Sequence, residues 1–355
     1  MMKSSYRNES IKMKFIIFSL LIFCNVTLLH ADITKTVGAT GSDFATLKQA
    51  FDAINLNSGG LFSGVVTLQI KDNTTETATA SLNASSGYTS VIIYTIVSGK
   101  SISGSIASAP LIDLNNAESV IIDGRLNATG AIPDLTISNT STSSNAGTST
   151  IRFINGAVNN VIKYSNILGA ETNVSSGVVF FSTSTSAQGN SNNTIANNKI
   201  SSVSSTNRPT NAIFSSGTAT KDNTGLIINA NIIFDFFRAS ATSYGVNLSS
   251  NTTACSIIDN SFYETTSFAT TTTSSYSLIY LNNPSGTGFV VSGNVMGGST
   301  LGNNGTFTKT GNNNNFYAIN VNVGTGTVTS IQNNVIKSIS WTNSGAADFV
   351  GINIT

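Results

Sequence analysis

The 355-residue sequence is poor in charged residues, histidine, cysteine and proline. Charged side chains make up 9% of it, against about 25% in ordinary soluble domains, and it has one histidine, two cysteines and four prolines. Serine, threonine, asparagine and glycine take their place. This composition disfavours helix bundles and suits short strands joined by polar turns. Because 40% of the residues are hydrophobic, disorder is also disfavoured, and an all-β fold with a long core is predicted.

Residues 1–31 have the pattern of a signal peptide. Two lysines precede an apolar run at 15–29, and the small residue Ala31 precedes a polar segment. This run is shorter than the roughly 18 residues of a membrane-spanning helix, and no later segment approaches that length. We expect cleavage after Ala31, with Met13 as an alternative start. The mature protein should not span a membrane and should be secreted or attached to the outer cell surface.

Cleavage at this point limits the chemistry available to the mature chain. It removes four of the 17 basic and one of the 16 acidic residues, leaving 13 and 15, so no basic surface for nucleic acid is expected. It also removes His30 and leaves Cys255 as the remaining cysteine. Disulfides, histidine zinc sites and Ser–His or Cys–His nucleophile pairs are therefore excluded as they stand. We expect a buried Cys255, no metal and no cofactor.

An asparagine-centred repeat organises the second half of the sequence. Each copy has an apolar residue, two other residues, an asparagine, one other residue and a second apolar residue, at intervals of 29 to 40 residues. A second short apolar strand follows each copy. This pattern predicts coils of three short strands that stack in parallel, with the asparagines forming a ladder at one tight turn. The ladder residues are Asn166, Asn198, Asn231, Asn260, Asn294 and Asn334.

The first half continues the same organisation. Segments 112–124 and 151–163 predict two further coils, and 65–70 and 91–97 predict strands. Residues 43–54 predict a helix that begins at the N-cap Ser42 and covers the open end of the stack. Its apolar face is formed by Phe44, Leu47, Phe51 and Ile54.

Three domains follow from these patterns: a signal peptide at 1–31, an N-terminal cap at 32–64, and a right-handed parallel β-helix at 65–355. Because Phe349–Thr355 stops inside the second strand of a coil, we expect the β-helix to be truncated at its C-terminal end.

The helix at Asp43–Phe51, the stretch Ile112–Gly124 and the asparagine-anchored coils resemble the pectin-lyase-like right-handed parallel β-helices. They are more similar still to the large secreted β-helical proteins of Bacteroidetes that the type IX system exports. The resemblance covers nearly all of residues 32–355. It implies an adhesin-like protein that is released or held at the cell surface.

The resemblance to pectin-lyase-like proteins also includes enzymes that cleave polysaccharides. In those enzymes the catalytic residues lie on the outward face of the second strand. Lyases of this kind need an acidic cluster for calcium plus an arginine or lysine, and hydrolases need paired carboxylates. Aligning the outward positions gives Asp113, Arg152, Val179, Phe214, Asn247, Tyr280, Asn320 and Asn353. With one acid among eight positions, we expect an Asp113–Arg152 ion pair and assign no catalytic residue.

Two other charged segments carry simple structural interpretations. Asp123-Gly-Arg125 is typical of a turn. Asp235 and Arg238 follow a strand and are expected to form a local ion pair or to anchor the loop, without a second carboxylate.

Two functions remain open. The first is a non-catalytic adhesin-like or glycan-binding protein whose ligand is a polysaccharide or a cell-surface partner; the alternative is a polysaccharide lyase or glycoside hydrolase with an unrecognised site. Phe214 and Tyr280 would present aromatic faces to a sugar, unless the loops at 263–276 or 297–315 cover them. The candidate ligand-binding residues are Arg152, Phe214, Asn247, Tyr280 and Asn320.

Overall fold

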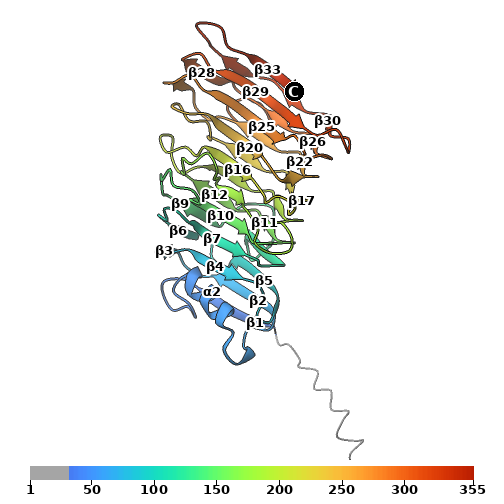
Figure 1. The fold of residues 1–355 in the computed structure, drawn as a ribbon. Helices are drawn as coiled ribbons and strands as arrows, with labels where there is room; N and C mark the ends of the chain where they lie inside the picture. Colours follow the sequence, from blue (N-terminus) through green and yellow to red (C-terminus); the bar gives the residue numbers. More distant parts are fainter. Residues whose placement is uncertain (1–31) are drawn as a thin grey trace, which may run out of the picture. The chain divides into compact units, whose positions relative to one another are not determined.

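The computed structural model describes residues 32–355, which form one compact unit. The predicted signal peptide, including His30, lies outside the described residues. Strands of successive coils lie one above another from the blue end of this unit to the red end (Figure 1). All the long sheets are parallel, which confirms the predicted all-β, right-handed parallel β-helix. Within residues 32–355, no helix is long and apolar enough to cross a membrane.

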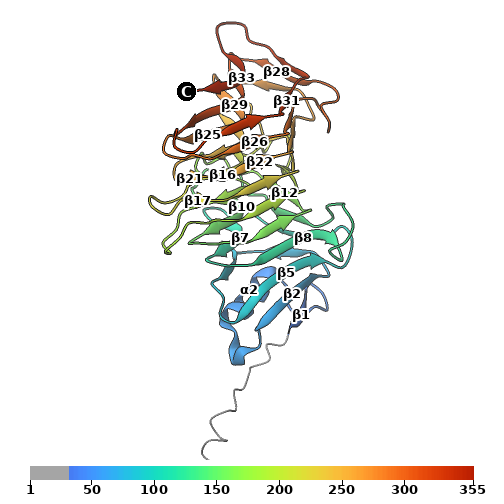
Figure 2. The same cartoon turned by 90° about the vertical axis from the view of Figure 1, so that its right-hand side faces the viewer.

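Three long sheets run along the stack, and we name them sheets A, B and C. Sheet A has ten strands, several of which are labelled in Figure 2. They are β1 (Ile33–Val37), β2 (Gly64–Ile70), β5 (Tyr88–Thr95), β8 (Val120–Leu126), β11 (Val161–Lys163), β14 (Thr194–Ala196), β18 (Ile227–Asn229), β22 (Ser256–Ile258), β26 (Val290–Ser292) and β30 (Ser330–Gln332).

Sheet B follows sheet A within each coil and has nine strands. They are β3 (Thr74–Glu76), β6 (Ser101–Gly104), β9 (Thr136–Asn139), β12 (Asn166–Gly169), β15 (Lys199–Ser202), β19 (Ile232–Phe234), β23 (Ser261–Tyr263), β27 (Val295–Met296) and β31 (Val335–Ile336).

Sheet C completes each coil, also with nine strands. They are β4 (Ala80–Asn83), β7 (Pro110–Asn115), β10 (Ser149–Ile154), β13 (Val179–Phe181), β16 (Asn211–Ser215), β20 (Ser243–Leu248), β25 (Ser275–Asn283), β29 (Asn315–Val323) and β33 (Phe349–Ile354).

Two small sheets lie in the connections between the long ones. One pairs β17 (Asn223–Thr224) with β21 (Thr252–Thr253). The other joins β24 (Phe268–Thr270), β28 (Phe307–Gly311) and β32 (Ile339–Trp341) between sheets B and C of the last coils. The second small sheet borders an aromatic part of the core, where the ring of Trp341 packs against Phe316 at a centroid distance of 4.8 Å.

Rows of aliphatic side chains fill the interior, one from each coil. In sheet A, Ile122, Ile162, Ile195, Ile228 and Ile257 stand in register, and all are fully buried. Burying such a side chain contributes about 1.5–3 kcal/mol. A shift of one residue would turn a whole row outward, so these rows fix the register of the coils.

The predicted helix is shorter than expected and begins later. Helix α2 spans Leu47–Leu56, and its N-cap is Thr46, whose hydroxyl accepts from the backbone N–H of Gln49 at 3.2 Å. The expected N-cap Ser42 is therefore wrong. The carboxylate of Asp43 accepts from the backbone N–H and the hydroxyl of Thr36, so this segment is tied to β1 instead.

Helix α2 covers the first coil, as Figure 1 shows at the blue end beside β4. Asn55 donates its amide N–H to the backbone oxygen of Ser81 at 2.8 Å and accepts from the backbone N–H of Asn83 at 2.9 Å. A side-chain amide thus takes the place of a neighbouring strand at the β4 edge of sheet C. Glu76 accepts from the N–H groups of Leu47 and Lys48 at the helix start, which a carboxylate stabilises.

The sequence assigned residues 32–64 to an N-terminal cap, but sheet A already begins within this range. Strand β1 pairs in parallel with β2, so the first strand of sheet A lies within residues 32–64. The short 3-10 helix η1 (Ser58–Gly60) then connects α2 to β2.

Candidate binding surfaces

The outward positions of sheet C form a continuous row, which we call the outward row. Strand register places Asp113 beside Arg152, Phe214 beside Asn247, and Tyr280 beside Asn320. The prediction that Val179 points outward is wrong, because Val179 is fully buried and pairs with core residues of the neighbouring strands. The outward row is Asp113, Arg152, Phe180, Phe214, Asn247, Tyr280, Asn320 and Asn353.

The first two residues of the outward row, at its N-terminal end, form an ion pair with each other. Arg152 donates through Nε and Nη2 to the two carboxylate oxygens of Asp113, at 2.9 and 2.8 Å. Asp113 is buried and Arg152 is partly buried. Both of these guanidinium donors are thus used by a carboxylate of the neighbouring coil, and the ion pair predicted from the sequence is present.

The middle of the outward row is covered. Phe214 is 5% exposed and packs against Phe180 at a ring-centroid distance of 5.5 Å. Asn247 is 6% exposed and donates to the side-chain oxygen of Asn211 at 3.0 Å. Neither side chain presents a face to a ligand, which corrects the expectation of an exposed aromatic at Phe214.

The C-terminal part of the outward row is open at Tyr280, and a second tyrosine, Tyr244, lies beside it on the preceding strand, outside the row. Tyr280 is half-buried, and its ring stacks on that of Tyr244 at 5.3 Å with an interplanar angle of 15°. Burial raises the pKa of Tyr244 to about 12 and also raises the pKa of Tyr280. Both phenols therefore stay neutral and can donate hydrogen bonds at physiological pH.

Two side-chain amide pairs continue this surface. Asn353 donates to the side-chain oxygen of Asn320 at 2.9 Å, and Asn322 donates to that of Asn282 at 3.2 Å. All four residues are partly exposed. We call Tyr244, Tyr280, Asn320 and Asn353 the tyrosine–asparagine surface, because they lie on four successive strands of sheet C.

The asparagine ladder lies at the turn between sheets A and B. The Nδ2 of each of Asn198, Asn231, Asn260 and Asn294 donates to the Oδ1 of the next ladder residue, at 2.9 to 3.1 Å, and the ladder ends at Asn334. Each Oδ1 also accepts the backbone N–H of the preceding ladder residue, at 2.9 to 3.0 Å. The amides therefore satisfy one another inside the protein.

The predicted ladder member Asn166 is wrong by one position. Asn166 pairs with Lys199 inside sheet B, and Ser165 occupies the turn and donates its backbone N–H to Asn198 at 3.0 Å. The left-handed backbone also falls one residue before each ladder residue, for example at Asn197 and Asp259. The ladder asparagines are thus required for their side chains rather than for an unusual backbone conformation.

Two further amide pairs lie at other turns and were not predicted from the sequence. Asn160 donates to Asn193 at 3.0 Å, and Asn190 donates to Asn223 at 3.1 Å. The sequence signal was available, since the members of each pair are separated by 33 residues.

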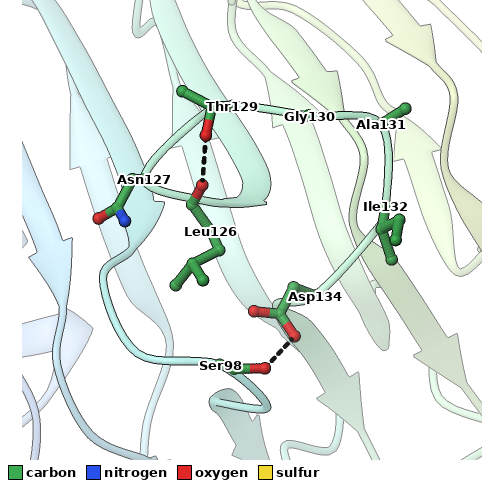
Figure 3. Close-up of a pocket in the computed structure, with 8 residues that line it drawn as sticks. All are labelled: Ser98, Leu126, Asn127, Thr129, Gly130, Ala131, Ile132 and Asp134. Atoms are coloured by element: carbon green, nitrogen blue, oxygen red, sulfur yellow. Dashed lines mark hydrogen bonds between the residues drawn. The ribbon is translucent and has the colours of Figure 1, made fainter.

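A pocket of about 350 Å³ lies beside the turn that follows β8, and Figure 3 shows the residues that line it. Asp134 accepts from the hydroxyl of Ser98 and the N–H of Gly99, both at 3.0 Å. The side chains of Leu126 and Ile132 supply an exposed apolar wall. The pocket holds none of the predicted binding residues, and its one carboxylate is used to tie two turns together.

The first charged segment does not form the expected turn, whereas Asp235 of the second anchors a loop by accepting the backbone N–H and the hydroxyl of Thr265, at 2.9 and 2.7 Å. Asp123 and Arg125 lie within strand β8 rather than in a turn, and Arg125 donates Nε to Asp123 at 2.8 Å. Asp235 pairs with Arg208 of the preceding coil, at 3.4 Å, and not with Arg238. Arg208 also forms an ion pair with the buried Glu264, so a second carboxylate does enter this region.

Glu264 and Cys255 are buried titratable groups with structural contacts. Glu264 accepts the backbone N–H groups of Phe236 and Phe237 at 3.1 and 3.0 Å, and burial raises its pKa to about 7. The fully buried thiol of Cys255 donates to the backbone oxygen of Thr253 at 3.1 Å, and burial raises its pKa to about 12. Neither group has a free, exposed atom for chemistry.

Comparison with known proteins yields structural similarities only. No protein-family model and no curated protein matches the chain. Two structures of PfbA, a surface adhesin of Streptococcus pneumoniae, are 12% identical; they cover 84% and 87% of this chain and 89% and 96% of their own, with TM-scores of 0.36 and 0.33. The A-module of a mannuronan C-5 epimerase from Azotobacter vinelandii is 12% identical, with a TM-score of 0.18, over 84% of this chain and 95% of its own. The fold assignment therefore rests on the sheets of this chain.

Proposed function

We propose that this protein is a non-catalytic, adhesin-like binding protein, secreted or held at the outer cell surface, whose ligand is an extended glycan. The ligand lies along the stack on the tyrosine–asparagine surface. The observation that carries the proposal is the half-exposed, stacked Tyr244–Tyr280 pair, which continues into the Asn320–Asn353 amide pair on the same face.

The chemistry of this surface suits sugars better than charged or apolar ligands. Aromatic rings present apolar faces, while amides and phenols both donate and accept hydrogen bonds. Successive strands of a parallel sheet are about 4.8 Å apart, so the surface extends about 14 Å from Tyr244 to Asn353. An extended chain can therefore engage several coils at once, whereas a compact ligand cannot.

The proposed location follows from the sequence. The signal-peptide pattern at 1–31 supports export, and the resemblance to large secreted Bacteroidetes proteins supports a type IX export route. Export also agrees with the ligand, because glycans and cell-surface partners lie outside the cell.

The alternative is a polysaccharide lyase or hydrolase. Glu264 favours it, because a buried carboxyl with a pKa of about 7 suits a general acid. Both of its oxygens, however, are held by Arg208 and by the N–H groups of Phe236 and Phe237. This arrangement supports a structural role for Glu264, so non-catalytic binding remains the proposal.

A glycan array tests the proposed site. Wild type should bind at least one extended glycan without releasing product, and the double variant Tyr244→Ala/Tyr280→Ala should lose at least tenfold in affinity. Tyr94→Ala is the matched control, because Tyr94 is half-buried on the outward face of sheet A and should leave binding unchanged. Circular dichroism checks that each variant is folded. Equal binding by the double variant and wild type, or glycan cleavage by wild type, would contradict the proposal.

A further inference from the structure

A second cleft lies among the loops that join sheet B to sheet C, and none of its lining residues belongs to the tyrosine–asparagine surface. It has a volume of about 390 Å³ and is lined by parts of three segments, at 205–208, 237–240 and 266–268. The lining contains Arg208, Arg238, Phe237 and Phe268, together with five hydroxyl side chains and no carboxylate. Hydroxyl and guanidinium groups supply hydrogen-bond donors, so the cleft is chemically suited to an acceptor-rich ligand.

Only one of the two arginines is already neutralised by carboxylates. Arg208 is 6% exposed, forms an ion pair with Glu264, and has Asp235 at 3.4 Å. Its Nη1 also donates to the backbone oxygen of Phe237 at 3.1 Å. Arg208 thus links its own coil to the next two coils, and its guanidinium has few N–H groups left to donate to a ligand.

Arg238 differs from the other arginines of residues 32–355. Arg125, Arg152 and Arg208 each form a salt bridge within 4 Å, whereas no described carboxylate lies within this distance of Arg238. Its Nη1 donates to the hydroxyl of Thr210 at 3.1 Å. This single neutral acceptor orients the guanidinium but leaves its charge uncompensated.

Glu171 is the acidic group whose charge acts on Arg238. Glu171 is 1% exposed, and neither of its carboxylate oxygens has a hydrogen-bond partner among the described residues. Burial raises its pKa well above the ordinary value, and the charge of Arg238 offsets only part of this effect. Glu171 forms no ion pair or hydrogen bond with Arg238, so the N–H groups of this guanidinium have no carboxylate partner among the described residues.

We propose that this cleft binds an oxyanion, such as a carboxylate, sulfate or phosphate group, carried on a single ring. Arg238 supplies the charge and a planar pair of donors, which match two oxygens of such a group. The hydroxyl side chains of the rim donate to the remaining oxygens, and Phe268 forms an apolar wall for the ring. A volume of this size fits a ring-sized ligand.

The proposal is tested by calorimetry on the full chain at low ionic strength, with glucose 6-sulfate, inorganic sulfate and glucose. Glucose 6-sulfate should bind, glucose should not, and Arg238→Gln should weaken binding at least tenfold. Arg125→Gln is the matched control, because Arg125 lies in β8 and pairs with Asp123 outside the cleft. It should bind glucose 6-sulfate as wild type does.

A rim variant keeps the test valid if Arg238→Gln does not fold. Ser240 is exposed at the edge of the cleft, so Ser240→Asp leaves the core intact and places a repelling charge beside the ligand, which should also weaken binding. Tighter binding of glucose 6-sulfate than of inorganic sulfate supports a ring that carries the oxyanion, and equal binding of the two overturns the assignment of a ring. Binding that is unchanged in both Arg238→Gln and Ser240→Asp, or glucose bound as tightly as glucose 6-sulfate, overturns the proposal. Because these variants leave Tyr244 and Tyr280 in place, either proposal can fail without the other.

Discussion

The side chain of Asn260 joins three consecutive coils. Its Oδ1 accepts both the backbone N–H and the side-chain N–H of Asn231, at 2.9 and 3.0 Å, and its Nδ2 donates to Asn294 at 3.0 Å. Because Asn260 is fully buried, each of these partners would be left without water if the amide were removed. The Asn260 amide therefore helps to hold the three coils together, in addition to the hydrogen bonds between their strands.

We predict that Asn260→Leu lowers the free energy of unfolding by about 1 to 3 kcal/mol, because it leaves buried donors and acceptors without partners. Urea unfolding measures the change. Asn312→Leu is the control, since Asn312 is exposed, and it should change stability by less than about 0.5 kcal/mol. Equal stability of Asn260→Leu and wild type would show that the ladder does not stabilise the coils.

Glu171 gives the protein a pH-dependent stability that can be isolated. Its pKa in the folded protein is raised well above the ordinary value by burial, so folding favours the protonated carboxyl. The stabilisation is complete below the ordinary glutamate pKa and is lost as the pH rises toward the folded-state pKa. Wild type should therefore lose stability relative to Glu171→Gln as the pH rises above 5, by no more than about 1.4 kcal/mol per pH unit.

Urea unfolding of both proteins between pH 5 and pH 9 measures this difference. Glu118→Gln, at an exposed position, should follow the wild-type profile. Parallel profiles for wild type and Glu171→Gln would contradict the assignment of a protonated buried carboxyl.

Helix α2 illustrates how an element other than a strand can close a parallel sheet. Asn55 forms two hydrogen bonds with the backbone of β4, and Glu76 accepts two backbone N–H groups of the helix. The edge of β4 that would otherwise pair with another strand is thereby covered. The helix thus contributes to the stack through specific polar contacts as well as through its apolar face.

We predict that Asn55→Ala lowers the free energy of unfolding by about 1 to 3 kcal/mol, because it unpairs an N–H and a carbonyl at the β4 edge. Asp52→Ala on the exposed face of α2 removes only an i,i+4 pair with Lys48 and should cost about 0.5 kcal/mol or less. Equal losses for the two variants, measured by urea unfolding, would show that the contacts of Asn55 with the β4 edge do not account for the effect.

The periodicity of the sequence predicted elements well and their exact register less well. Asparagine spacing located the turns, because the same turn recurs in every coil, yet Asn166 fell one position from the ladder turn, where Ser165 stands. The run Val178–Phe181 offers four consecutive large residues, so alternation alone could not decide between Val179 and Phe180 as the outward residue.

The charged site was harder to predict than the strands. Arg208 and Glu264 are 56 residues apart, and nothing in the local sequence of either one indicates the other. Only the stacking of coils brings them together. Likewise, the coverage of Phe214 depends on neighbouring segments whose course the repeat does not specify, whereas the exposure of Tyr280 agrees with its predicted outward position.

At the scale of the whole molecule, stacking turns single positions into long surfaces. Each coil adds one residue to the outward row, so the properties of that surface change along the stack. It has an ion pair at Arg152, covered side chains at Phe214, and an open tyrosine followed by amides from Tyr280 onward. A ligand that follows the stack meets the same spacing at every step. Binding should therefore depend on ligand length.

The central claim, non-catalytic binding of an extended glycan on the tyrosine–asparagine surface, is tested most directly by calorimetry with oligomers of increasing length of an array-positive glycan. Affinity should rise with length until the oligomer spans the four strands from Tyr244 to Asn353 and then level off, and mass spectrometry should show every oligomer unchanged. Tyr244→Ala/Tyr280→Ala should remove this dependence on length. Affinity that is the same for the shortest and longest oligomers, or shortened oligomers after incubation with wild type, would contradict the account.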